Sequence, residues 1–173
     1  VNGNCAGSNQ ASFTFILKEM PVITNSNLTQ TICTGGTTSP INISSSMSSG
    51  TIFNWTVTAT NGITGFTTPG SSAVIPATTL NNPSNTSGTV TYTVTPSNNG
   101  CVSTPVNFVI TVNPAPLVPA QALTTCSGNA FTLSLTNNPP SIILPLGTTF
   151  TWTVSSPVGI TGASNQTTPV STI

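Results

Sequence analysis

Two short segments of the 173-residue chain are almost identical, although 97 residues separate them. The motif Phe-x-Trp-Thr-Val occupies residues 53–57 and returns at residues 150–154. Each copy is followed by the tetrapeptide Gly-Ile-Thr-Gly, at residues 62–65 and 159–162. Similarity at a fixed period is typical of a tandem array of one structural unit. A period near 95 residues is too long for a solenoid, and it matches the size of one β-sandwich domain.

The four cysteines recur on nearly the same period. Cys5 and Cys101 are 96 residues apart, and each follows an Asn or a Gly. Cys33 and Cys126 are 93 residues apart, and each precedes a hydroxyl residue and a glycine. The cysteines therefore belong to the repeating unit rather than to one position in the chain.

This period predicts three parts. Residues 1–20 are expected to be the C-terminal end of a preceding repeat, residues 21–115 a complete repeat, and residues 116–173 the N-terminal part of a following repeat. The chain then resembles a stretch cut from a longer array, whose secretion and anchoring signals would lie outside it.

Alternation of apolar and hydroxyl residues predicts strands with one buried face. In residues 88–95 every second residue is apolar and the others are Thr. The same alternation recurs in residues 53–58, 106–112 and 131–135, and residues 12–17 form another strand-like run. The expected core residues on the inward faces are Phe53, Trp55, Val57, Val90, Tyr92, Val94, Phe108 and Ile110, with Trp152 as the counterpart of Trp55.

Turn residues and the missing helical pattern complete the prediction of fold class. No stretch has apolar residues at helical spacing, and 15 Pro and 14 Gly interrupt the chain. The Asn99-Gly100 step between two strand-like runs favours a hairpin turn with positive φ angles. We expect an all-β chain of tandem immunoglobulin-like antiparallel β-sandwich repeats.

The composition excludes most chemistry. Lys18 and Glu19 are the only charged side chains, and the chain has no His, Asp or Arg. General acid–base catalysis, activation of a Ser nucleophile and Ca²⁺ binding all require those residue types. The cysteines are too widely spaced for a zinc knuckle, and phosphate recognition would need Lys and Arg. We therefore expect no enzyme activity, no catalytic, cofactor or metal site, and no nucleic-acid partner. No run approaches 18 apolar residues, so we expect no membrane insertion of this segment.

The expected complete repeat contains Cys33 and Cys101, and one disulfide per repeat would suit a modular unit. Closing a loop of this length would stabilise the fold by about 4 kcal/mol, and the bond would imply an oxidising compartment. On this hypothesis Cys5 and Cys126 are unpaired only because their own repeats are truncated. A bond between repeats, such as Cys5–Cys33 or Cys101–Cys126, is the alternative, as are free thiols.

Two conspicuous motifs have a structural and a functional interpretation. Trp55 and Trp152 could be platforms on which sugars stack, but their neighbours on the same strand face favour core packing. The Gly-Ile-Thr-Gly segments could be binding loops, although a tight turn after a core strand is the interpretation that their position favours.

The order of motifs resembles the PKD-like repeats of giant Bacteroidetes surface proteins, especially the flavobacterial gliding-motility adhesins of the SprB type. The most specific parts are residues 88–96, the Gly-Cys at residues 100–101 and the Val-Asn-Pro at residues 112–114. The resemblance implies export by type IX secretion and display at the cell surface as a filament. The chain lacks the acidic segment that PKD domains carry after the Trp strand, so roles of those acidic residues do not transfer.

These observations predict a stalk segment of a secreted cell-surface adhesin. Its partners would be neighbouring repeats of the same chain, with surface polysaccharide or other surface and secretion proteins as further candidates. A carbohydrate-binding module is the alternative, and lateral assembly of uncharged sheet edges into fibres is a third hypothesis.

Overall fold

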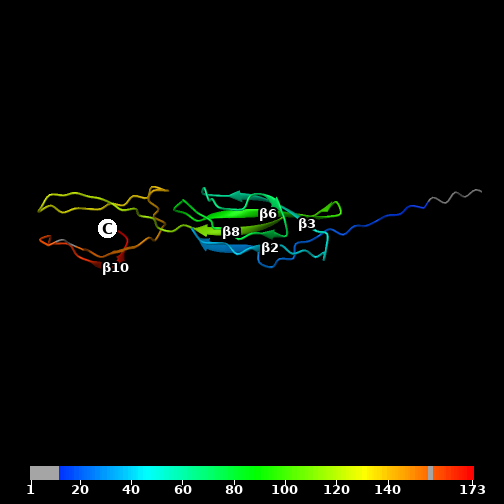
Figure 1. Ribbon diagram of the computed structural model, residues 1–173, viewed down its shortest axis with the longest axis horizontal. Coiled ribbons are helices and arrows are strands. Elements are labelled where there is room, and N and C mark those ends of the chain that lie inside the picture. Colours follow the sequence, from blue (N-terminus) through cyan, green and yellow to red (C-terminus); the bar gives the residue numbers. More distant parts are fainter. Residues whose placement is uncertain (1–11, 156–157) are drawn as a thin grey trace, which may run out of the picture.

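The structure is a computed structural model that describes residues 12–155 and 158–173. Within these residues every regular element is a strand, and none is a helix. Figure 1 shows three parts in a row: an extended N-terminal segment, a compact strand-rich unit, and a strand-poor C-terminal segment. The all-β prediction is therefore confirmed.

One sheet of six strands forms the larger layer of the compact unit. Its order is β1 (Thr29–Cys33), β8 (Val106–Asn113), β6 (Gly88–Asn98), β3 (Ile52–Ala59) and β4 (Gly70–Ser71). The short β7 (Cys101–Val102) pairs with the end of β6. The longest ladder joins β3 to β6, and β6 also pairs antiparallel with β8.

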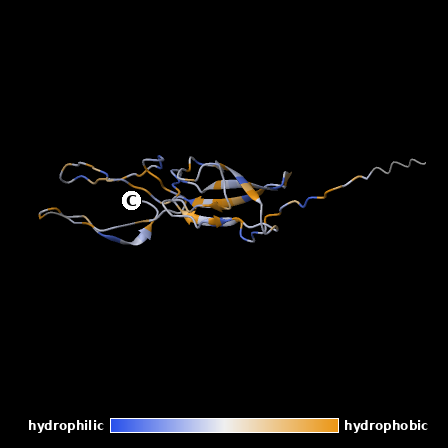
Figure 2. Cartoon of the chain, turned by 45° about the vertical axis from the view of Figure 1, so that its right-hand side comes forward, coloured by the Kyte–Doolittle hydropathy of each residue, from blue (hydrophilic) through white to orange (hydrophobic). Residues whose placement is uncertain are grey.

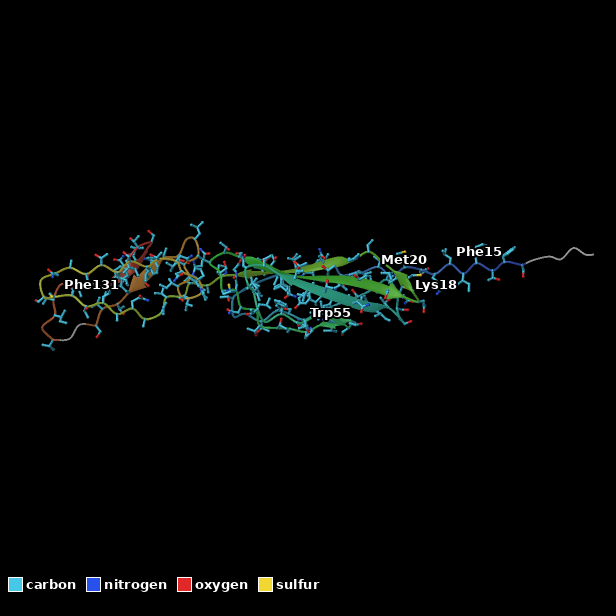
Figure 3. All side chains as sticks on the ribbon, turned by 90° about the horizontal axis from the view of Figure 1, so that it is seen from above. Phe15, Lys18, Met20, Trp55 and Phe131 are labelled. Carbon is cyan, nitrogen blue, oxygen red and sulfur yellow. The ribbon has the colours of Figure 1, made fainter. Side chains whose placement is uncertain are left out.

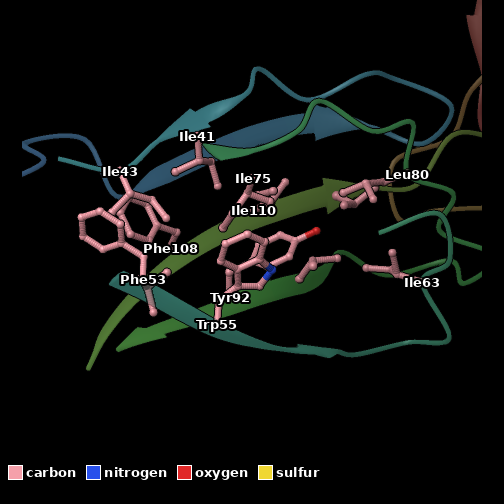
Figure 4. Packing of buried hydrophobic residues seen from close by; sticks show 13 residues of the cluster. Ile41, Ile43, Phe53, Trp55, Ile63, Ile75, Leu80, Tyr92, Phe108 and Ile110 are labelled. Carbon is pink, nitrogen blue, oxygen red and sulfur yellow. The ribbon is translucent and has the colours of Figure 1, made fainter. Parts of the chain in front are cut away.

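A smaller layer covers one face of this sheet. It consists of β2 (Ile41–Asn42) and β5 (Val74–Ile75), which pair antiparallel. An isolated bridge between Thr37 and Thr79 extends the pairing beyond the two short strands. The two layers form a sandwich, and apolar side chains from both layers fill the space between them (Figure 4).

Strict alternation decides which side chains reach this core. Along β6 every second residue is buried, from Gly88 to Asn98, and the intervening residues are half-exposed. Apolar colour is concentrated on the strands of the compact unit in Figure 2. The buried apolar residues of the larger sheet are Phe53, Trp55, Val90, Tyr92, Val94, Phe108, Ile110 and Val112. Val57 lies at the edge of this cluster, partly buried against it.

The Asn99-Gly100 hairpin has the conformation that its sequence predicts. The φ angles are 48° at Asn99 and 85° at Gly100, and the flanking residues Asn98 and Cys101 pair. Two successive positive φ angles are typical of a type I′ turn, which matches the twist of the flanking strands. Local sequence therefore determines this end of the sandwich.

One strand pair departs from the expected antiparallel pattern. The first and last strands, β1 and β8, are neighbours and run parallel, from Thr29 opposite Val109 to Cys33 opposite Asn113. Because both strands point the same way, the chain enters the sandwich at one end and leaves it at the other. A hairpin turn cannot create such a pair, which needs a long crossover connection. Here the other strands of the sandwich lie between β1 and β8 in the sequence.

The C-terminal segment has only two short strands. β9 (Phe150–Trp152) pairs antiparallel with β10 (Gln166–Val170). The strands predicted at residues 131–135 and 12–17 do not form: these residues have no strand partner, and Phe131 is 68% exposed. Alternation supplies a strand face, but a strand also needs a neighbour to pair with.

Candidate functional site: the two ends of the complete repeat

The cysteines of the complete repeat lie at its two ends. Cys33 is the last residue of β1, is exposed, and lies opposite Asn113, where β8 ends. The backbone N–H of Thr34 donates to the carbonyl of Asn113 at 2.8 Å, which holds this end of β1 against the last residue of β8. Cys33 therefore lies at the end of the sandwich where the chain leaves.

Cys101 occupies the opposite end. It follows the Asn99-Gly100 turn, pairs with Asn98, and is half-buried. The strand β6 runs between the two ends, because Gly88 lies opposite Val112 and Asn98 lies opposite Cys101. Strands rise about 3.3 Å per residue, so the length of β6 separates the two cysteines by roughly 30 Å.

The predicted Cys33–Cys101 disulfide is therefore not formed in this structure. A disulfide requires its two Cα atoms to lie within about 7 Å, and both cysteines are free thiols in this structure. The alternative Cys101–Cys126 pair does not meet either, because Cys126 is also free and the strand-poor C-terminal segment lies beyond the other end of the sandwich (Figure 1). Cys5, and with it the Cys5–Cys33 pair, lies outside the described residues. Spacing along the sequence suggested one bond per repeat, but the parallel β1–β8 pair separates the two thiols.

A buried amide fixes the end that carries Cys33. The side chain of Asn82 is 1% exposed, and its Nδ2 donates to the carbonyls of Thr86 and Val112, both at 2.9 Å. Its Oδ1 accepts from the backbone N–H of Ser84 at 3.0 Å. The hydroxyl of Thr34, next to Cys33, accepts from the backbone N–H of Asn82 at 2.8 Å. Sequence reasoning missed Asn82, because a lone Asn in an Asn-rich chain gives no periodic signal.

The end that carries Cys101 is in contact with the N-terminal segment. Lys18 Nζ donates to the carbonyl of Asn99 at 2.9 Å, across 81 residues of sequence. Figure 3 shows Lys18 at the point where the extended segment meets the sandwich. Asn99 is a turn residue two positions before Cys101. The residues around Lys18 predict no role for it, and its proximity to the turn follows only from the fold.

Trp55 is part of the core and is not a sugar platform. It is 6% exposed and packs with Phe53 and Tyr92 in the same cluster. Its indole leaves no room for a side chain at Gly70 on the neighbouring strand, since a Cβ there would lie 2.9 Å from Trp55 Cζ2. The counterpart Trp152 is half-buried in β9, and its Nε1 donates to the carbonyl of Ser164 at 3.2 Å.

A groove of about 260 Å³ lies between β1, β8 and the start of β2. Two of the amide side chains that line it, those of Gln30 and Asn25, already have partners within the chain. Gln30 exchanges two hydrogen bonds with the backbone of Ser39, at 2.9 and 3.0 Å. Asn25 donates to the carbonyl of Asn42 at 2.7 Å and accepts from the backbone N–H of Ser44 at 2.9 Å. These amides tie β1 to the second layer, so they are not free to bind a sugar.

Metal ligands do not gather in the part of the chain that the structure describes. Among those residues, no three His, Cys, Asp or Glu side chains lie close enough together to hold a metal ion. Nor does any helix in the described ranges have the length and apolar character that crossing a membrane requires.

Comparison with known proteins agrees with the fold. The PKD-like domain family matches residues 30–116, a range that runs from β1 to just beyond the end of β8. No curated protein and no solved structure matches the chain. PKD-like domains are typically non-catalytic structural domains that occur in extracellular proteins. On the strength of this match, which spans half of its length, the chain belongs to the PKD-like domain family.

Proposed function

We propose that the chain is a spacer segment of an extracellular protein, in which tandem PKD-like repeats hold an adhesive region away from the cell. Membership of the family supports a structural or adhesion repeat outside the cell. The residue types present support a structural role, because one Lys and one Glu in 173 residues supply little catalytic chemistry.

The parallel pairing of β1 with β8 is the observation that carries this proposal. Residues 29–33 of the first strand lie beside residues 109–113 of the last strand. Pulling the two ends of the repeat apart would slide β1 along β8, so that the ladder of hydrogen bonds is loaded in shear. All bonds of the ladder then share the force, whereas in an unzipping geometry they break one after another. A spacer under tension benefits from the shear geometry.

The segment that leaves β8 supports an extended array. Pro114-Ala115-Pro116 follows the last residue of β8 directly. Proline-rich segments favour the polyproline II conformation and act as semi-rigid spacers. A short stiff connection between repeats would transmit force without coiling.

The motif resemblance to flavobacterial gliding adhesins supports a more specific version of the proposal. Under that version the array is exported by type IX secretion and forms a filament on a gliding cell. Its partners would be the neighbouring repeats, with surface polysaccharide or other surface proteins contacted by other parts of the protein.

Single-molecule force spectroscopy tests the spacer role. With handles at the two termini of the chain, we expect one discrete unfolding event that releases roughly 300 Å, the contour length of about 95 residues less the folded length. A matched control uses the same chain with Cys5, Cys101 and Cys126 replaced by Ser and one handle moved to Cys33. Force between Cys33 and the C-terminus acts at the same end of β1 and β8, so it unzips the ladder.

We expect the shear geometry to require a force several times higher than the unzipping geometry at the same loading rate. Forced unfolding is governed by the unfolding rate, so the difference reports on the barrier in each direction. Equal forces in the two geometries, or unfolding without a discrete event, would remove the support for a mechanical spacer.

A further inference from the structure

The cysteines of the repeats occupy two kinds of position. Cys33 and its counterpart Cys126 come early in their repeats, whereas Cys101 and its counterpart Cys5 come late. In the complete repeat the early cysteine lies at the exit end and the late cysteine at the entry end. In a tandem array the exit end of one repeat faces the entry end of the next. Early and late cysteines of consecutive repeats therefore lie at the same junction.

The exit end brings Cys33 close to the start of the connection. Cys33 lies opposite Asn113, and Pro114 follows directly. Neighbouring strands are about 4.8 Å apart, so Cys33 is one strand spacing from the residue at which the chain leaves the sandwich. Its side chain is exposed at this end.

The entry end shows which part of a repeat meets its predecessor. Met20-Pro21 is the counterpart of Asn113-Pro114, 93 residues earlier. Lys18, two residues before Met20, donates to the carbonyl of Asn99. The hairpin that precedes Cys101 is thus in contact with the segment that corresponds to the end of a β8 strand. The early cysteine of the preceding repeat would lie beside that same strand end.

We propose that a disulfide joins Cys33 of one repeat to the late cysteine, the equivalent of Cys101, of the repeat that follows it. The proposal uses each cysteine once and leaves none inside a repeat. Within these 173 residues neither such pair is complete: the partner position of Cys33 would fall near residue 197, and that of Cys101 would fall before residue 1. The free thiols of Cys33, Cys101 and Cys126 agree with this arrangement.

The bond forms by thiol–disulfide exchange with a small-molecule disulfide such as oxidised glutathione. The thiolate of one cysteine attacks the glutathione disulfide and releases one glutathione, and the second thiolate then displaces the other. Two protein thiols become one disulfide, one glutathione disulfide becomes two glutathione thiols, and the two protons move from the protein thiols to the departing glutathione. An oxidising compartment supplies this reagent.

Such a bond would tie the exit end of one repeat to the entry hairpin of the next. Because Cys33 lies beside Asn113, the disulfide and the chain connection would cross the junction side by side and restrict the angle between the two repeats. This inference goes beyond the spacer role and does not depend on it: the force experiment uses a single complete repeat, in which the proposed bond has no partner and cannot form.

A chain with one duplicated repeat tests the proposal. Residues 1–113 are joined to residues 21–173. Asn113 is then followed by Pro21, as it is followed by Pro114 in the natural sequence, and Asn113 takes the place of Met20 before the second copy. The buried cluster of the duplicated unit lies within residues 23–112, so each copy retains its whole core. Cys5 and Cys126 are replaced by Ser, and the protein is equilibrated with oxidised and reduced glutathione. Thiols are then counted by alkylation and mass spectrometry.

We expect the duplicated chain to have two free thiols and one disulfide. The unduplicated chain with the same two replacements should have two free thiols and no disulfide. Cys33→Ser in the first copy should abolish the bond, and Cys33→Ser in the second copy should leave it intact. Cys101→Ser should abolish the bond when it is made in the second copy and leave the bond intact when it is made in the first copy.

A position control separates a built junction from chance collision. Thr31 lies on the same exposed face of β1, two residues further from the exit end. Moving the thiol there, with Thr31→Cys and Cys33→Ser in the first copy, should slow bond formation about tenfold or more, because the effective concentration of the two thiols falls with distance. Four free thiols in the duplicated chain, a bond between Cys33 and Cys101 of the same copy, or equal rates at positions 31 and 33 would each overturn the proposal. Circular dichroism of every reduced variant verifies that the copies are folded.

Discussion

The complete repeat and the C-terminal segment carry the same motifs in different surroundings. Ile63 of the first Gly-Ile-Thr-Gly is 3% exposed, whereas its counterpart Ile160 is 60% exposed. The glycines that end the two tetrapeptides nevertheless share a conformation, with φ angles of 92° at Gly65 and 94° at Gly162. Turn geometry is thus encoded locally, whereas burial depends on strands that are distant in sequence.

Strand pairing follows the same division. Trp55 lies opposite Gly70 in the β3–β4 pair, and Trp152 lies opposite Gln166 in the β9–β10 pair. The short pair therefore recurs in both regions. Among the described C-terminal residues, however, β9 and β10 form a sheet of two strands without counterparts of β6 and β8, so the face of β9 has no large sheet to join. Phe131, whose alternating run resembles a core strand, remains exposed for the same reason.

The largest expected effect distinguishes the two tryptophans. Trp55→Ala should lower the free energy of unfolding of the complete repeat by about 3–5 kcal/mol, because it leaves a cavity in a closed core. The buried indole N–H of Trp55 has no hydrogen-bond partner, so the effect comes from packing. Trp152→Ala should change the same transition by less than about 0.5 kcal/mol. Urea unfolding followed by circular dichroism measures both, and similar losses for the two variants would contradict a division between closed and open regions.

Alternation at period 2 was sufficient to predict the sandwich and most of its core. Residues 90, 92 and 94 of β6 are buried because a strand directs alternate side chains to opposite faces. The Asn99-Gly100 turn was predictable for an equally local reason. The distance between Cys33 and Cys101 was not predictable, because it depends on which strand lies beside β1 and in which direction that strand runs. A parallel pair of the first and last strands leaves no signal in residues that are neighbours in sequence.

A buried amide provides the second test, at the end of the repeat that carries Cys33. Asn82→Ala removes the Nδ2 donor from the carbonyls of Thr86 and Val112, and the acceptor from the N–H of Ser84. Unpaired buried polar groups cost about 1–3 kcal/mol each, so we expect a loss of about 3 kcal/mol.

Asn81→Ala, at the exposed neighbouring position, is the matched control and should cost less than about 1 kcal/mol. Its side chain accepts from the hydroxyl of Thr34 in an exposed hydrogen bond. Denaturant midpoints at constant m-value give the comparison. Equal losses at positions 81 and 82 would show that burial of the amide is not what stabilises this end.

Gly70 provides a smaller test of the packing around Trp55. In Gly70→Ala the new methyl group would meet the rigid indole, so the sheet has to shift. Overpacking of this kind costs about 1–3 kcal/mol, and we expect a value near the lower end because β4 is a short edge strand. Ser71→Ala, one residue further on the same strand and exposed, should be nearly neutral. Thermal unfolding of the two variants decides the point: equal melting temperatures would mean that β4 yields without cost.

The smallest expected effect applies to both regions equally. Residues 21–115 and residues 116–173 contain no Asp, Glu, His, Lys or Arg. Stability depends on pH only where the folded and unfolded states bind different numbers of protons, and Asp, Glu and His are the side chains that titrate between about pH 4 and 7. We expect the free energy of unfolding to change by less than about 0.5 kcal/mol across that range. Sodium chloride between 0.01 and 0.5 M should have as little effect, since there are no side-chain charges to screen.

Ammonium sulfate is the positive control for this comparison, because excluded salts strengthen the burial of apolar surface whatever the charge of the protein. It should raise the denaturant midpoint of the complete repeat while sodium chloride at equal ionic strength does not. A marked response to sodium chloride would mean that the few charges outside the repeat, Lys18 above all, stabilise it through contacts such as the one with Asn99. The junction, rather than the core, would then limit the stability of the array.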